Sequence, residues 1–210
     1  MSSPQQTPDA TLASKATPTI DAADAVLHIH SARLIEASTQ DVWNALTDTS
    51  TWPSWNTFVP RVTIRAQPGV TSSESSLSPV LQQGTKMTFH VQMDPSAPKP
   101  QRAQDIPLVV AEFDPPDAAT KKPGRVVWTA DVSASGSLPA FLLTAERVHE
   151  VEQVGETPGG KAVTEVRNWE AQVGYLVYVV RWMYGVQLKK NFETWVQGLK
   201  TYVEKGGAAA

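Results

Sequence analysis

The order of hydrophobic and polar residues predicts strands through most of the chain and a helix at its end. Strand patterns lie at about residues 26–36, 58–66, 85–94, 106–113, 125–132, 140–154 and 162–173. The segment 85–94 is the clearest, because its apolar residues occupy every second position, as in a half-buried strand. A glycine-containing loop at 155–160 joins the last two segments and predicts a hairpin.

Helical patterns lie after the first strand and at the end of the chain. Ser38 can cap a short helix with Trp43 and Leu46 on its apolar face, and a second short helical turn is predicted at 49–55. Residues 175–204 repeat apolar side chains at the spacing of an amphipathic helix. This order predicts an α+β fold in which the long helix lies across a curved antiparallel sheet. The gap between helix and sheet would suit a small apolar ligand.

Composition favours one domain with its own core and flexible ends. Of the 210 residues, 41% are hydrophobic, which is enough to bury a core without disulfides. Residues 1–25 contain no aromatic residue and no long apolar run, so we predict a disordered tail there. The domain then covers 26–205, and 206–210 form a flexible end. No signal peptide or membrane span is recognisable, and we therefore expect a cytoplasmic protein.

Several classes of function are excluded by what the chain lacks. Without cysteine it forms no disulfide, zinc–thiolate site or iron–sulfur cluster. The motifs of serine hydrolases, zinc proteases, phosphate-binding loops and dinucleotide-binding folds are absent. The four histidines lack the spacing of metal ligands, so we expect neither a metal nor a cofactor. A formal net charge of -3 gives no reason to expect nucleic acid as a partner.

Three stretches carry motifs of one superfamily. They read IEASTQDVWNALTD at 35–48, WPSWNTFV at 52–59 and FETWVQGLK at 192–200. On these motifs the chain resembles the START-like superfamily, also called SRPBCC, which includes polyketide cyclase/dehydrases and lipid-transport proteins. The resemblance covers about residues 26–204 and implies a helix-grip fold with an internal cavity. It does not imply one activity, because the superfamily holds carriers, receptors and enzymes.

Polar candidates for a site lie on the two strands of the long hairpin. His149 is a candidate catalytic residue because histidine exchanges protons near neutral pH, and Arg147 shares its strand face. Across the hairpin, Glu170 and Arg167 lie on opposite faces of their strand. Apolar residues lie on both faces of these two strands, so the pattern leaves open which face points to the interior. Arg147 and Glu170 either bind a ligand in the cavity or belong to a solvated, salt-bridged outer surface.

Aromatic candidates come from the short helical turn, one strand and the closing helix. We expect Trp55 and Trp128 to contact the ligand, although Trp55 also suits a structural role in the core. Tyr175, Tyr178 and Trp182 form one stripe at the start of the long helix. This stripe either packs in the core or turns its polar tips toward a ligand. In the second case Tyr178 and Trp182 bind the ligand and Tyr175 is a candidate proton donor.

Two functions stay open on the sequence alone. The first is a carrier that binds a lipid, quinone, polyketide or similar amphipathic molecule by burying it in the cavity. The second is a cofactor-free polyketide cyclase or dehydratase that holds a flexible substrate in a reactive shape. A role in binding another protein is a third possibility. The sequence names neither the ligand nor a protein partner nor the oligomeric state.

Overall fold

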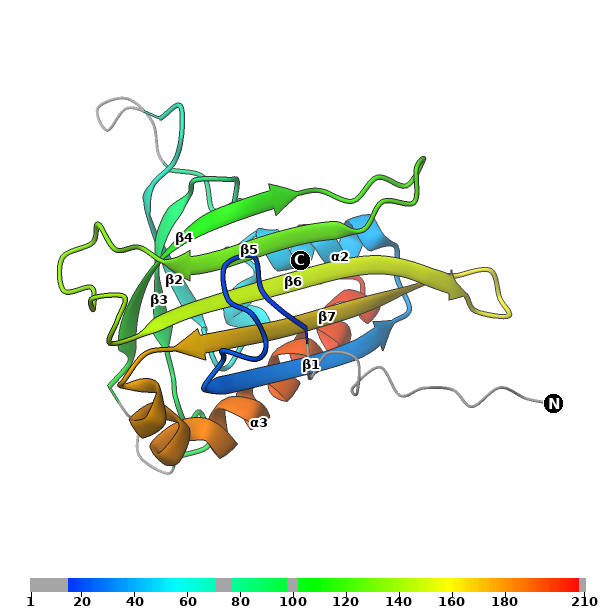
Figure 1. Ribbon diagram of the computed structural model, residues 1–210. Coiled ribbons are helices and arrows are strands. Elements are labelled where there is room, and N and C mark those ends of the chain that lie inside the picture. The colour runs from blue at the N-terminus through cyan, green and yellow to red at the C-terminus, as the bar shows by residue number, and fades with distance from the viewer. Residues whose placement is uncertain (1–14, 71–76, 98–101, 208–210) are drawn as a thin grey trace.

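The computed structural model describes residues 15–70, 77–97 and 102–207, and their strands form one antiparallel sheet (Figure 1). The strand order is β1-β7-β6-β5-β4-β3-β2. The strands are β1 (Leu27–Ile35), β2 (Arg61–Ala66), β3 (Lys86–Val91), β4 (Gln104–Asp114), β5 (Gly124–Ala130), β6 (Thr144–Glu156) and β7 (Ala162–Val173). The helical elements are α2 (Thr39–Thr47), the 3-10 turn η1 (Trp52–Ser54) and α3 (Val177–Glu204).

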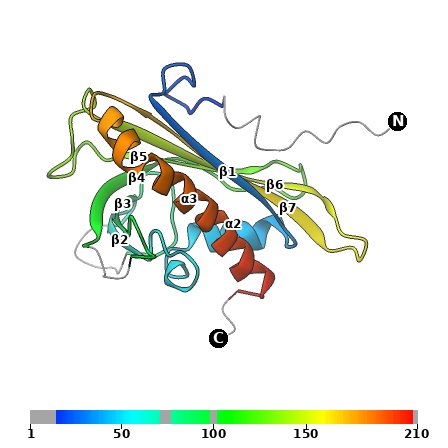
Figure 2. The same ribbon diagram turned by 90° about the horizontal axis from the view of Figure 1, so that it is seen from below.

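The sheet curves around α3, which crosses its concave face, and α2 lies on the same side (Figure 2). The hydrophobic core fills the space between these layers, with side chains from the sheet, α2, η1 and α3. This arrangement confirms the predicted α+β, helix-grip fold. Within the described residues, no helix has both the length and the hydropathy needed to cross a bilayer.

Local sequence explains where the helices begin. The Ser38 hydroxyl caps α2 by accepting a hydrogen bond from the Asp41 backbone N–H at 3.1 Å. α3 has no side-chain cap and instead follows a tight corner at Gly174, whose φ of +115° favours glycine. A Cβ atom there would lie 2.5 Å from the Leu142 carbonyl oxygen. The corner therefore fixes where α3 leaves the sheet.

Several element boundaries differ from those predicted, and three of them have a clear local cause. β2 begins at Arg61 and not at 58, because Phe58 and Val59 turn into the core before the strand starts. The helical turn predicted at 49–55 is confined to η1. β6 begins at Thr144 and not at 140, because the backbone N–H groups of 142 and 143 donate to the Pro139 carbonyl in a turn.

The segment before β1 covers part of the convex face of the sheet, opposite α3 (Figure 1, Figure 2). The Trp169 indole N–H donates to the Ala16 carbonyl at 3.0 Å, and the Lys15 ammonium lies 4.2 Å from the centre of the same indole. The Thr19 backbone N–H donates to Glu146 at 2.9 Å. Of the tail predicted at 1–25, residues 1–14 lie outside the described residues, and 15–25 make these contacts.

Candidate functional site

A cavity of about 230 Å³ lies between the concave face of the sheet and the N-terminal half of α3. The helix contributes Val180, Tyr184 and Leu188, which recur every four residues and therefore lie on one face. The opposite walls are mostly apolar side chains of the sheet and of the segment before β2. They include Phe58, Val59, Phe89, Val91, Leu108 and Trp128.

A buried ion pair interrupts this apolar wall. Arg147 on β6 lies directly opposite Glu170 on β7, and its Nε atom donates to Glu170 Oε2 at 2.7 Å. Gln172 donates from Nε2 to the other oxygen, Glu170 Oε1, at 2.5 Å. The two charged side chains are only 11% and 9% exposed. Since desolvation makes a buried ion pair a poor source of stability, this pair is a candidate for function.

Aromatic rings hold the guanidinium group in place. Its central carbon lies 4.2 Å from the centre of the Phe192 ring and 5.7 Å from the centres of Phe58 and Trp195. This packing leaves the edge of the planar group available for hydrogen bonds. Between described residues, only the Nε atom of Arg147 makes one. The terminal nitrogens therefore remain as donors beside the cavity.

The two faces of the long hairpin have different roles. Arg147, His149 and Glu170 point to the concave, inner side, where they meet the core or the cavity. Arg167 lies on the outer side and forms ion pairs with Glu150, Glu152 and Glu165. Trp169 also lies on the outer side, in a small cluster with Val127 and Val148. The structure thus assigns the face that the sequence pattern left open.

His149 is fully buried and does not line the cavity. Its ring lies 4.4 Å from Trp128 and 5.6 Å from Trp195, measured between ring centres. Neither ring nitrogen has a hydrogen-bond partner among the described residues. Burial, and next the charge of Arg147, lower the pKa of His149 well below its ordinary value. The side chain is therefore neutral near pH 7, and its neighbour Trp128 lines the cavity.

The remaining predicted site residues divide into two groups. Trp128, Arg147 and Glu170 line the cavity together. Trp55 belongs to the core, where its indole N–H donates to Thr51 Oγ1 at 3.1 Å. The three aromatic residues at the start of α3 are not part of the cavity wall. These are Tyr175, Tyr178 and Trp182, which are 75%, 59% and 85% exposed.

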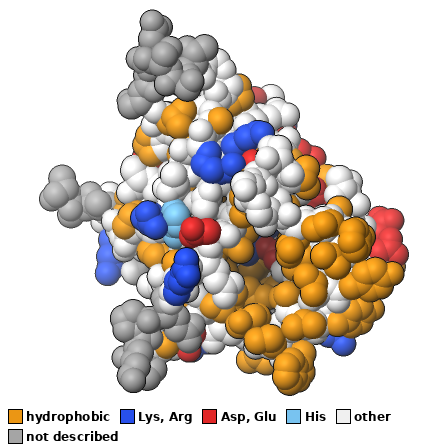
Figure 3. Space-filling model, turned by 90° about the vertical axis from the view of Figure 1, so that its left-hand side faces the viewer, with side chains coloured by type: hydrophobic (Ala, Val, Ile, Leu, Met, Phe, Trp, Pro, Cys, Tyr) orange, Lys and Arg blue, Asp and Glu red, His pale blue; other side chains and the backbone are white. Residues whose placement is uncertain are grey.

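Exposed apolar side chains gather over the start of α3 (Figure 3). Besides the three aromatic residues, the helix exposes Val179, Met183 and Val186. The loop between β5 and β6 exposes Phe141 and Val132. Apolar residues of this half of α3 therefore occupy both sides of the helix, one toward the cavity and one toward solvent.

Most residues of the cavity wall were missing from the sequence prediction, and two sets of them could have been found. Val180, Tyr184 and Leu188 carried a usable signal, because they repeat every four residues on a helix face offset by two positions from that of the exposed stripe. Gln172 shares a strand face with Glu170, so it would have followed from knowing which face is inside.

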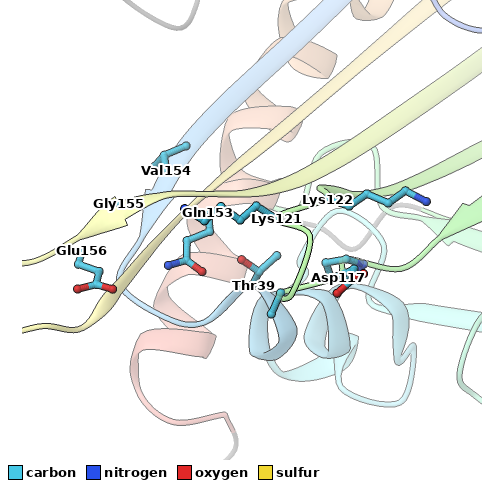
Figure 4. A pocket seen from close by; sticks show the side chains of 10 residues that line it. Thr39, Asp117, Lys121, Lys122, Gln153, Val154, Gly155 and Glu156 are labelled. Carbon is cyan, nitrogen blue, oxygen red and sulfur yellow. The ribbon is translucent and has the colours of Figure 1, made fainter.

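A second cleft, of about 460 Å³, lies between the start of α2, the β4–β5 turn and the end of β6 (Figure 4). Two of its charged groups, Asp117 and Lys122, are engaged with neighbours. Asp117 accepts a hydrogen bond from the Thr120 hydroxyl at 2.8 Å, and the Lys122 ammonium lies 2.6 Å from Asp114. Figure 4 shows the Lys122 side chain extending away from Gln153. The cleft therefore resembles ordinary polar surface, and the cavity under α3 is the stronger candidate.

Comparison with known proteins gives one relative by sequence and several by structure. No protein-family model matches the chain. Oxopyrrolidines biosynthesis cluster protein O of Penicillium oxalicum is 44% identical over 190 residues, which cover 90% of this chain and 92% of that protein. A START superfamily protein from Mycobacterium smegmatis superposes with a TM-score of 0.54 over 85% of this chain and 97% of its own, at 11% identity. A hypothetical protein from Helicobacter pylori reaches 0.59 over 83% and 86%, at 15% identity. The structural likenesses establish the START-like fold.

Proposed function

The chain belongs to the family of oxopyrrolidines biosynthesis cluster protein O, and we propose that it binds a small amphipathic molecule of a biosynthetic pathway under α3. The observation that carries this proposal is an apolar cavity with one buried ion pair in its wall. Burial of apolar ligand surface would supply affinity, and the polar groups would set orientation. The pathway context comes from the name of the relative.

The size of the cavity favours a compact ligand. Its volume of about 230 Å³ lies below the roughly 300–1,000 Å³ of common ligand sites. A long lipid chain would need the walls to move apart. Among the ligands considered from sequence, a small ring compound or short polyketide fits better than a lipid.

A cofactor-free cyclase or dehydratase is the second candidate, and the relative's place in a biosynthesis cluster favours it. The cavity would then hold a flexible substrate in a reactive shape. Arg147 would polarise a carbonyl oxygen, since its terminal nitrogens donate to none of the described residues. In the described conformation neither His149 nor Tyr175 lines the cavity, so the machinery would centre on Arg147 and Glu170.

Fluorescence of N-phenylnaphthylamine, a neutral dye that brightens in apolar surroundings, tests the binding site. We expect wild-type protein to enhance the dye and Ala145→Phe, which fills the cavity, to abolish the effect. Trp182→Ala is the matched control, because it removes the most exposed ring of the α3 surface and leaves the cavity intact. Thermal melts should show that both variants fold. Loss of fluorescence in Trp182→Ala, with retention in Ala145→Phe, would place the dye on the surface and refute the proposal.

A further inference from the structure

The polar part of the cavity wall offers both donors and acceptors. The terminal nitrogens of Arg147 carry N–H groups that no described residue uses. The Glu170 carboxylate accepts one hydrogen bond from a described residue at each oxygen, and a carboxylate has about four acceptor sites in all. Gln172 Oε1 is buried without a partner among the described residues. Donor and acceptor capacity therefore lie side by side, and most of the remaining wall is apolar.

The charge of this cluster selects against ions. Arg147 and Glu170 neutralise each other at 2.7 Å. An anion drawn to Arg147 would also approach the Glu170 carboxylate, and a cation drawn to Glu170 would approach the guanidinium group. In a cavity with few other polar groups, such repulsion is poorly screened. A neutral polar group avoids both costs.

We propose that the cavity recognises a neutral ligand whose polar head carries a hydrogen-bond acceptor and a donor side by side, as in a secondary amide or lactam. The carbonyl oxygen accepts from Arg147, and the N–H group donates to Glu170 or Gln172. The apolar remainder of the ligand lies against Val180 and Leu188. The inference deepens the proposed function and rests on it, because it requires a ligand in this cavity.

The unpaired Gln172 oxygen supports the same assignment. A buried acceptor without a partner is costly, and native proteins satisfy most such groups. Gln172 Nε2 donates to Glu170, and the amide oxygen of the same side chain accepts from none of the described residues. A ligand N–H group would satisfy it after a small adjustment of the side chain. A ligand with only an acceptor would leave it unpaired.

Four ring compounds of similar size test the head group on wild-type protein. They are a phenyl-substituted pyrrolidinone with a free N–H group, its N-methyl derivative, phenylcyclopentanone and phenylcyclopentane. Binding is followed by displacement of N-phenylnaphthylamine and by protein-observed NMR. We expect the free lactam to bind at least about tenfold more tightly than each of the other three, because each lacks one or both hydrogen bonds. Equal affinity of all four would overturn the head-group assignment while leaving the cavity as a binding site. Binding of none would refute the proposed function itself.

A double variant tests whether the polar cluster, and not the cavity as a whole, sets the preference for the lactam. Arg147→Met with Glu170→Leu replaces both partners by apolar groups, which folded proteins often tolerate when a buried ion pair is removed as a unit. The double variant should lose the preference for the lactam and still bind phenylcyclopentane. Arg125→Met on the outer face of β5 is the control and should keep the wild-type preference. A preserved lactam preference in the double variant would contradict the inference. The wild-type series decides the question by itself should the double variant fail to fold.

Discussion

The two halves of α3 lie under the same sheet, yet one half is packed solid and the other covers a cavity. In the C-terminal half, Phe192, Trp195 and Leu199 are at most 1% exposed. Trp195 meets the Trp52 ring edge-on, with 4.9 Å between ring centres. In the N-terminal half, Val180 and Tyr184 are only half buried and border the cavity. The same helix therefore serves as core at one end and as a cavity wall at the other.

The difference follows from the side chains that face each half. Large rings from η1, β3 and β5 fill the space under the C-terminal half, and they include Trp52, Phe89 and Trp128. The N-terminal half faces the cavity, where Phe89 and Trp128 form part of the wall but smaller residues such as Ala145 leave volume empty. Elements with few buried contacts open at a lower free energy than the core. A ligand site next to the loosely held half can therefore admit its ligand without unfolding the packed half.

Trp195→Ala should have the largest effect on stability. The ring is 1% exposed and contacts several other rings, so its removal leaves a large cavity in the packed half. Large-to-small changes of this kind cost about 3–5 kcal/mol. Urea denaturation of the variant and the wild type measures the loss. A cost below about 1 kcal/mol would mean that the C-terminal half is not the tightly packed region described above.

Gly198→Ala and Gly185→Ala should change stability in opposite directions. A Cβ atom at Gly198 would lie 2.3 Å from the Trp55 carbonyl oxygen, so the helix must move away, at a cost of about 1–3 kcal/mol. At Gly185 the nearest atom outside the local backbone, Arg181 Cγ, lies 3.7 Å away, which is ordinary contact. Alanine there should stabilise the helix by about 0.5–1 kcal/mol. Thermal melts compare the pair, and gains at both sites would contradict the close packing at Gly198.

The sequence predicted most of the fold because the strands and the long helix carry regular periods. β7 was predicted at 162–173, and the structure gives the same bounds. The start of β6 was placed too early, because apolar residues between Pro139 and Leu143 extend the strand pattern into a turn. Hydrophobic periodicity alone does not distinguish such a turn from the strand that follows it.

The site was harder to predict, because β6 and β7 bury apolar residues on both faces. Val148 is buried on the outer face and Val151 on the inner face. On β7, Trp169 is covered by the segment that precedes β1. The composition of this segment had predicted a disordered tail. Alternation identifies the inner face only when the other face is exposed to water. If the segment over the outer face had been known, Arg147 and Glu170 could have been assigned to the inner face.

His149→Phe should stabilise the protein, and the gain should grow as the pH falls. Phenylalanine keeps an aromatic ring at this position and removes two ring nitrogens that lack partners among the described residues, a gain of about 1–2 kcal/mol at pH 7. The folded-state pKa is lowered, so below about pH 6.5 the unfolded chain binds a proton that the folded protein does not.

The wild type therefore loses stability as the pH falls from about 6.5 toward the folded-state pKa of His149, and the variant lacks this contribution. The other histidines are present in both proteins and cancel in the difference. Chemical denaturation between about pH 7 and pH 5 measures this difference in the free energy of unfolding. Parallel pH profiles for the two proteins would contradict a buried, neutral histidine.

Trp182→Ala should have the smallest effect on stability, although it removes the same type of side chain as Trp195→Ala from the same helix. The Trp182 ring is 85% exposed, so little burial is lost. Alanine also has the higher helix propensity, which offsets the lost contacts. We expect a change within about 0.5 kcal/mol by urea denaturation. A loss comparable to that of Trp195→Ala would show that the solvent side of the N-terminal half is covered in solution. The two halves of α3 would then not differ in packing as described above.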